Sequence, residues 1–301
     1  MKNLDINKSQ RKLGASGVKI FPIAYGMWRF AGTSTDQARA KIDTALEEEI
    51  TLFDTADIYG FGEDGFGAAE ELLGKVLAKA PGLRKQMIIA TKGGITPPVP
   101  YDSTQDYLVS ACENSLKRMN LEYIDLYQMH RPDVLTHPED VARALNKLVA
   151  DGKVHHVGVS NYTAAQFRAL SKYLDKPLVS HQPELSVLAP EPLTNGLLDQ
   201  CMEYQASPLA WSPLGGGRLF SDSSDTVQRV VTALDAVASG QGATLEAVAC
   251  AWLLAHPAGI IPIIGTQSIE RIRQTKDIFD VAITRSQWYD ILEAAVGYPM
   301  P

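Results

Sequence analysis

The sequence predicts a (β/α)8 barrel of the TIM type, and three observations carry this prediction. Short apolar runs alternate with helix-period stretches along the chain, eight times in all. Such alternation is typical of a parallel sheet covered by helices. The length of 301 residues suits one closed barrel, because barrels of this kind run to about 250 residues or more. The rhythm has no break, so we expect residues 1–301 to form a single domain rather than two.

The eight apolar runs predict the strands, at residues 23–28, 52–56, 87–91, 124–129, 156–160, 178–181, 208–211 and 260–264. Between them, apolar residues recur on one helical face, as Ala69, Leu72, Leu73 and Val76 do. Two additions complete the predicted fold. Residues 11–20 contain two glycines and predict a β-hairpin before the first strand, and residues 284–296 predict an extra C-terminal helix.

Helix boundaries agree with this division of the chain. Thr35 and Thr104 stand where residues that cap a helix N-terminus are expected. Pro138 occupies a first-turn position, which proline tolerates because it lacks the N–H that would be unpaired there. Gly152 follows the fourth predicted helix, as glycine commonly does after a helix end.

Composition excludes several classes of function. The chain has 28 basic and 35 acidic residues, a net charge of −7, which argues against a general nucleic-acid binder. The three cysteines are far apart, so neither a disulfide framework nor a metal site is predicted. The polar first ten residues do not resemble a signal peptide, and no run of about 20 apolar residues could span a bilayer. We expect a cytoplasmic protein without a membrane partner, and its oligomeric state is left open.

Residues 60–65 read Gly-Phe-Gly-Glu-Asp-Gly and match the pattern of a Rossmann dinucleotide site. Three features argue against that interpretation. Three residues separate the strand from the first glycine, two carboxylates would face the pyrophosphate, and the next strand offers no acid for a ribose. We interpret the segment as a flexible loop at the mouth of the barrel.

The chemistry-bearing residues lie where the predicted strands end. Asp54 ends the second strand, with Tyr59 just beyond it, while Lys92 and His130 end the third and fourth. The carboxyl ends of barrel strands are where such enzymes place their active sites. An acid, a phenol, an amine and an imidazole are therefore expected to converge at one mouth.

These four side chains suit proton transfer to a carbonyl oxygen. A free tyrosine has a pKa near 10, and we expect the Lys92 ammonium to lower that pKa in Tyr59 by stabilising the phenolate. Asp54 can pair with Lys92 so that the ammonium is not buried alone. His130 can donate a hydrogen bond to the same oxygen. No residue is a source of hydride, so a cofactor must supply it.

Motifs spread along the chain resemble those of the aldo-keto reductases. They are Phe-Asp-Thr-Ala-Asp-Ile-Tyr-Gly at 53–60, Thr-Lys-Gly-Gly at 91–94, Ile-Asp-Leu at 124–126 with His-Arg-Pro-Asp at 130–133, and Gly-Val-Ser-Asn at 158–161. The resemblance runs from about residue 12 to about residue 295. It is strongest to the bacterial YdhF-like oxidoreductases, marked by Gly-Gly-Gly-Arg-Leu-Phe at 215–220 and Gly-Tyr at 297–298.

The resemblance implies a role for each matching residue. Asp54, Tyr59, Lys92 and His130 would form the catalytic tetrad, and Trp28 would line the substrate pocket. The nicotinamide would lie on Ser160, Asn161, Gln182 and Trp211, and the pyrophosphate on a loop with Ser212, Leu214, Gly215, Gly216, Gly217 and Arg218. Gly265, Thr266, Arg271 and Gln274 would hold the adenosine end at the start of the eighth helix, where a helix N-terminus suits an anion. Thr275 departs from the family, whose asparagine reads the adenine.

The resemblance implies an NADP(H)-dependent enzyme, with NADP(H) preferred over NAD(H), that reduces small aldehydes or ketones. In an acidic protein the basic residues near an anionic cofactor matter most, namely Arg218, Arg271 and Arg273. Two alternatives stay open at this point. Relatives with this fold serve as nucleotide-sensing subunits of ion channels, and some barrel enzymes use a lysine such as Lys92 as a Schiff-base nucleophile.

Overall fold

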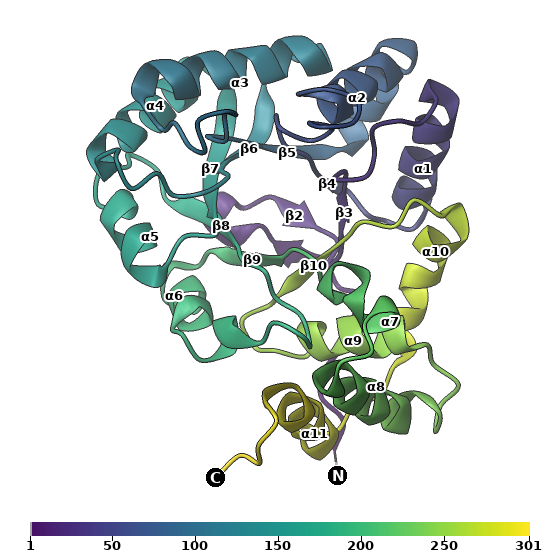
Figure 1. The fold of residues 1–301 in the computed structure, drawn as a ribbon. Helices are drawn as coiled ribbons and strands as arrows, with labels where there is room; N and C mark the ends of the chain where they lie inside the picture. The colour runs from purple at the N-terminus through teal and green to yellow at the C-terminus, as the bar shows by residue number, and fades with distance from the viewer. Residues whose placement is uncertain (1) are drawn as a thin grey trace.

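The computed structural model describes residues 2–301 and shows a closed barrel of eight parallel strands (Figure 1). The barrel strands are β3 (Ala24–Gly26), β4 (Leu52–Asp54), β5 (Ile88–Gly93), β6 (Ile124–Met129), β7 (Val154–Ser160), β8 (Leu178–Gln182), β9 (Ser207–Ala210) and β10 (Ile261–Ile264). Each strand pairs with the next along the chain, and β10 closes the sheet by pairing with β3. The predicted (β/α)8 barrel is confirmed.

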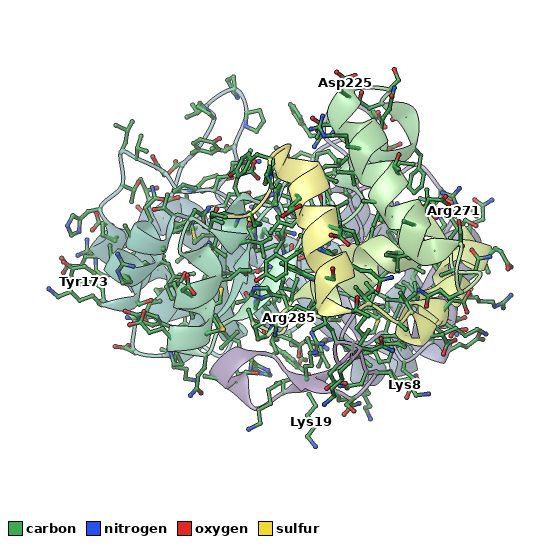
Figure 2. All side chains as sticks on the ribbon, turned by 90° about the horizontal axis from the view of Figure 1, so that it is seen from below. Lys8, Lys19, Tyr173, Asp225, Arg271 and Arg285 are labelled. Carbon is green, nitrogen blue, oxygen red and sulfur yellow. The ribbon has the colours of Figure 1, made fainter. Side chains whose placement is uncertain are left out.

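Helices surround the barrel on its outer side (Figure 1). They are α1 (Thr35–Glu47), α2 (Ala68–Lys79), α3 (Gln105–Met119), α4 (Pro138–Ala150), α5 (Ala164–Ser171), α6 (Leu197–Tyr204), α7 (Arg218–Ser221), α8 (Asp225–Ala238), α9 (Leu245–Leu254), α10 (Ile269–Arg273) and α11 (Arg285–Val296). The predicted C-terminal helix is α11. Three α-helices lie between β9 and β10, so the four-residue α7 and the longer α8 are also additional to the repeat, and neither was predicted. α8 contacts α11, and the two lie side by side in Figure 2.

The predicted hairpin closes one end of the barrel. Its strands β1 (Arg11–Lys12) and β2 (Lys19–Ile20) pair antiparallel. Leu13 and Ile20 are fully buried, in one cluster with side chains from the barrel strands. The Ser207 hydroxyl, at the amino end of β9, donates to a hairpin carbonyl. Figure 2 shows Lys19 of the hairpin and Asp225, the first residue of α8, at opposite ends of the molecule.

The helix ends follow the sequence with two corrections. Thr104 stands at the N-terminal boundary of α3 as predicted, but its side chain makes no capping hydrogen bond. Ser34, not Thr35, caps α1, because its hydroxyl accepts the N–H of Gln37 at 3.2 Å while the Gln37 side chain accepts the N–H of Ser34. Pro138 is the first residue of α4, and Gly152 follows that helix in the left-handed region, both as predicted. Among residues 2–301, no helix is long and apolar enough to cross a bilayer.

The end of α1 contains a left-handed residue that is not glycine. Glu49 has a φ of 63°. Its N–H donates to the Leu46 carbonyl at 3.0 Å, and the N–H of Ile50 donates to the Ala45 carbonyl at 2.9 Å. These two bonds close the helix in the manner that glycine favours at this position. An L side chain held there costs roughly 1 kcal/mol.

We predict that Glu49→Gly raises the free energy of unfolding by about 0.5 to 1 kcal/mol, because glycine adopts this conformation without strain. Urea denaturation of the variant and the parent protein measures the difference. Glu48→Gly is the matched control, and it should lower stability because Glu48 has a φ of −89°. An equal loss of stability in both variants would contradict the interpretation.

Candidate active site

The structure brings the four predicted tetrad residues together at the carboxyl ends of β4, β5 and β6. Asp54 is the last residue of β4, Lys92 lies in β5, His130 follows β6, and Tyr59 lies in the loop after β4. All four are buried. The Lys92 Nζ lies 2.7 Å from the Asp54 Oδ2 and 4.8 Å from the centroid of the Tyr59 ring. The Tyr59 and His130 rings meet edge to face at 5.9 Å.

The ion pair of Asp54 and Lys92 is buried, and both of its members make further hydrogen bonds. The Lys92 ammonium also donates to the Thr55 carbonyl at 2.6 Å. The second oxygen of Asp54 accepts the amide N–H groups of Gln182 at 2.9 Å and Gln128 at 3.3 Å. Burial alone would lower the pKa of Lys92, but Asp54, and then Tyr59, raise it above its ordinary value. Lys92 is therefore charged, which argues against its use as a Schiff-base nucleophile.

Tyr59 differs from the sequence prediction in one respect. Burial raises the pKa of its phenol, and the Lys92 ammonium, the next largest influence, lowers it by less. The expectation of a lowered pKa was wrong because the phenol is buried and Asp54 also opposes its ionisation. Tyr59 is therefore fully protonated at neutral pH, which is the form that a general acid requires.

His130 carries no charge at neutral pH. Burial, Lys92 and Arg131 together hold the pKa of its imidazole well below the ordinary value. A neutral imidazole has one N–H to donate, and the buried Nδ1 of His130 has no hydrogen-bond partner among residues 2–301. The imidazole can therefore offer one hydrogen bond to a ligand without bringing a second positive charge next to Lys92.

The residues predicted to face the nicotinamide form one hydrogen-bonded chain. The Ser160 hydroxyl donates to the Gln182 carbonyl at 2.9 Å, and the Asn161 amide donates to that hydroxyl at 2.9 Å. The Trp211 indole donates to the Asn161 amide oxygen at 3.1 Å. Because the Gln182 amide donates to Asp54, this chain connects Trp211 to the ion pair.

The glycine-rich segment after β9 turns through successive left-handed residues. Ser212 has a φ of 51°, and the three glycines have φ values of 61°, 69° and 100°. A Cβ built on Gly217 would meet no atom within 4 Å, so the segment faces open space there. Arg218, which was predicted to serve the cofactor, is turned back, because its Nε donates to the Gly215 carbonyl and its guanidinium lies 3.7 Å from Glu184.

The segment after β10 only partly matches its predicted role. Gly265 and Thr266 follow β10, but α10 has just five residues, so its N-terminus carries little of the dipole expected for anion binding. Arg271 is exposed, and the described residues include no carboxylate within 4.0 Å of it. Thr275 is buried and its hydroxyl donates to the Ile272 carbonyl, so this hydroxyl is already engaged within the protein. Gln274 begins a 3-10 turn.

Trp28 is not a core residue, because 63% of its surface is exposed. Its indole meets the Tyr59 ring edge to face at 4.9 Å, so it stands beside the phenol at the barrel mouth. The segments that follow β4, β5 and β6 also expose large apolar side chains, namely Phe61, Phe66, Val99, Tyr101, Val134 and Leu135. Exposed apolar side chains are therefore present in three of the segments that follow the strands bearing the tetrad.

The glycine loop at residues 60–65 is closed on itself. The Gly60 carbonyl accepts the N–H groups of Glu63, Asp64 and Gly65 at 3.2, 3.0 and 2.9 Å. Those N–H groups are therefore not available to a phosphate, and the closed barrel excludes a Rossmann sheet. The loop interpretation agrees with the structure.

Sequence reasoning assigned no role to a second layer of buried polar side chains, although Asp57 was visible just beyond the second predicted strand. Gln128 supports Asp54, and its place two residues before His130 on an apolar strand was a usable signal. Glu70 is fully buried on α2 and is held by Thr91 at 2.5 Å and by Arg118 at 2.7 Å. Asp57 is buried, and neither of its side-chain oxygens has a hydrogen-bond partner in the part of the chain that the structure describes. Burial, and then Glu70, raise its pKa.

We predict that Asp57→Asn stabilises the protein at alkaline pH. Because the folded state raises the pKa of Asp57, its contribution to stability is complete below the unfolded pKa and falls as pH rises. Asparagine stays neutral, so the advantage of the variant should shrink as pH falls and vanish near pH 4, about the unfolded pKa of aspartate. Thermal unfolding between pH 4 and 9 measures this, with exposed Asp64→Asn as the control. A difference that does not vary with pH would contradict the prediction.

Residues 22–295 match the family model described as the aldo/keto reductase family. The chain belongs to this family and is therefore an oxidoreductase, as its resemblance predicted. It is 49% identical to the 6-dehydroglucose reductase of Novosphingobium aromaticivorans over the full length of both chains. It is 36% identical to the oxidoreductase YdhF of Escherichia coli K12, over 96% of this chain and 98% of YdhF. The crystal structure of the thermostable aldo-keto reductase Tm1743 with the inhibitor epalrestat has a TM-score of 0.83 at 25% identity, covering 95% of this chain and 99% of that one.

Proposed function

We propose that the protein reduces an aldehyde or ketone to an alcohol, with NADPH as the hydride donor and Tyr59 as the general acid. One observation carries the proposal: a protonated phenol stands between a buried ammonium and a neutral imidazole. This arrangement suits protonation of an oxygen on which negative charge develops. We also propose that residues 1–301 form a single domain, which includes the barrel, the hairpin and α11.

The protein's own groups have separate tasks in this reaction. Tyr59 gives its proton to the carbonyl oxygen, and Lys92 stabilises the phenolate that remains. His130 donates a hydrogen bond to the same oxygen, and Trp28 forms a wall of the pocket beside Tyr59. Asp54 keeps the ammonium in place and touches neither reactant. When bound, NADPH supplies the hydride that the side chains cannot.

Two features of the structure fit a dinucleotide. Open space lies over Gly217 and Gly265, and a run of left-handed glycines lets a ligand approach the backbone closely. Ser160, Asn161, Gln182 and Trp211 would lie beside the nicotinamide. The hydrogen bond from the Gln182 amide to Asp54 would fix the orientation of the Gln182 side chain there. Residues 212–218 would hold the pyrophosphate. Gly265, Thr266, Arg271 and Gln274 would hold the adenosine end.

The relatives suggest the substrate. Two proteins named 6-dehydroglucose reductase are 49% and 41% identical to this chain over nearly their whole length. We therefore propose that the substrate is a small sugar carbonyl compound, and that 6-dehydroglucose is the first compound to test. The exposed Trp28 ring offers a flat surface on which the carbon-bound hydrogens of such a ring can pack.

We predict that Tyr59→Phe lowers kcat by about a hundred- to ten-thousandfold, the range that a general acid contributes. The variant keeps the ring that Trp28 and His130 contact, so NADPH binding should change little. Steady-state kinetics and fluorescence titration with NADPH measure the two quantities. Tyr101→Phe, at an exposed tyrosine between β5 and α3, is the control and should keep its activity. Full activity in Tyr59→Phe would contradict the role assigned to the phenol.

We predict that the purified protein oxidises NADPH when 6-dehydroglucose is added, and more slowly with simple aldehydes of similar size. The decrease in absorbance of NADPH follows the reaction. Slower turnover of 6-dehydroglucose than of every other aldehyde in a broad panel would contradict the substrate proposal. Tight NADPH binding without turnover on any carbonyl compound would contradict the enzymatic role and favour a nucleotide-sensing one.

A further inference from the structure

A lysine on α1 reaches the segment that follows β10. Lys41 is only 7% exposed, and its Nζ donates to the Gln267 side-chain oxygen at 2.8 Å. It also lies 5.9 Å from the centroid of the Phe30 ring. The first and last helices of the barrel, α1 and α10, contact each other and lie side by side in Figure 1. Lys41 is thus brought to Gln267, which is 226 positions away in the sequence and lies just before α10.

Within residues 2–301, Lys41 has no counter-charge. The acids of α1 each pair with another cation: Asp36 with Lys79 at 3.4 Å, Asp43 with Arg39 at 2.7 Å and Glu47 with Arg273 at 3.7 Å. Among residues 2–301, no carboxylate lies within 4.0 Å of the Lys41 ammonium. Burial lowers the pKa of the Lys41 amine, and no nearby carboxylate raises it again.

Lys41 lies on the buried, largely apolar face of α1, where a charged side chain is uncommon. Its neighbours on the buried face of α1 are Ala38, Ile42 and Ala45. A lysine on such a face costs stability, because a desolvated charge without a carboxylate partner is unfavourable. A buried charge without a counter-charge lowers stability, and such unfavourable positions are expected mainly at functional sites.

Lys41 and Arg271 approach the same short segment. Arg271 lies in α10, four residues beyond Gln267 in the sequence, and it also lacks a carboxylate within 4.0 Å in the described residues. The two other cations singled out from the sequence are engaged elsewhere, since Arg218 lies near Glu184 and Arg273 near Glu47. A Cβ built on Gly265 would meet no atom within 4 Å, so this segment faces open space.

We propose that Lys41 is a specificity-determining residue which, with Arg271, supplies the positive charge that binds the phosphate on the adenosine ribose of NADPH. The inference rests on the proposed function, which puts the adenosine end of the cofactor at this segment. NADH lacks that phosphate, so a positive charge at this position raises the affinity for NADPH over that for NADH. The five-residue α10 supplies little of this charge, so side chains must provide it.

The test compares binding of the two oxidised cofactors by Lys41→Met, which keeps the length of the side chain and removes its charge. Quenching of tryptophan fluorescence gives the Kd for NADP⁺ and for NAD⁺ without any turnover. We expect NADP⁺ to bind about tenfold more weakly, the loss of one charge-assisted hydrogen bond, while NAD⁺ binding changes less than about twofold. Lys75→Met, on the exposed face of α2, is the matched control and should alter neither Kd.

Thermal unfolding separates this role from a structural one. Because Lys41→Met removes a buried charge, its Tm should equal or exceed that of the parent protein. Unchanged NADP⁺ binding in Lys41→Met, or an equal loss for both cofactors, would overturn the inference and leave the proposed reductase intact. If the parent protein binds NAD⁺ as tightly as NADP⁺, the NADPH preference in the proposed function fails instead, and the inference fails with it.

Discussion

The lysine ammonium inside the barrel is the constraint on which the rest of the site depends. Burying an unpaired charge costs several kcal/mol or more, so Lys92 requires the carboxylate of Asp54 at 2.7 Å. Asp54 in turn accepts hydrogen bonds from Gln128 on β6 and Gln182 on β8. Side chains from four strands are therefore committed to one ion pair, and the barrel holds them because all its strands end at the same mouth.

This ion pair also sets the protonation states around it. Lys92 stands close enough to the Tyr59 ring to favour a phenolate, yet burial keeps the phenol protonated. The same ammonium, with burial, keeps His130 neutral. At neutral pH the tetrad thus holds one negative charge, one positive charge and two neutral donors. Tyr59 is the donor whose conjugate base the ammonium stabilises, which separates its task from that of His130.

The sequence was sufficient for what depends on local pattern and barrel topology. Alternating strands and helices predicted the barrel, and the strand ends placed Asp54, Lys92 and His130 together. What depends on burial or distant contact could not be predicted. The sign of the Tyr59 pKa shift depends on how much of the ring its neighbours cover. The pattern of α8 is that of an ordinary amphipathic helix, so the sequence does not distinguish it from the helices of the repeat. Lys41 meets Gln267 only because the barrel closes.

Single-turnover reduction by two variants tests the central claim that the ion pair serves catalysis. Lys92→Met should lose stability, because it leaves Asp54 charged and buried alone. The double variant Asp54→Asn, Lys92→Met removes both charges, so it should regain much of that stability. With NADPH and aldehyde at saturation, both variants should react at least about a hundredfold more slowly than the parent protein. A double variant that is stable and reacts at the parent rate would contradict the account.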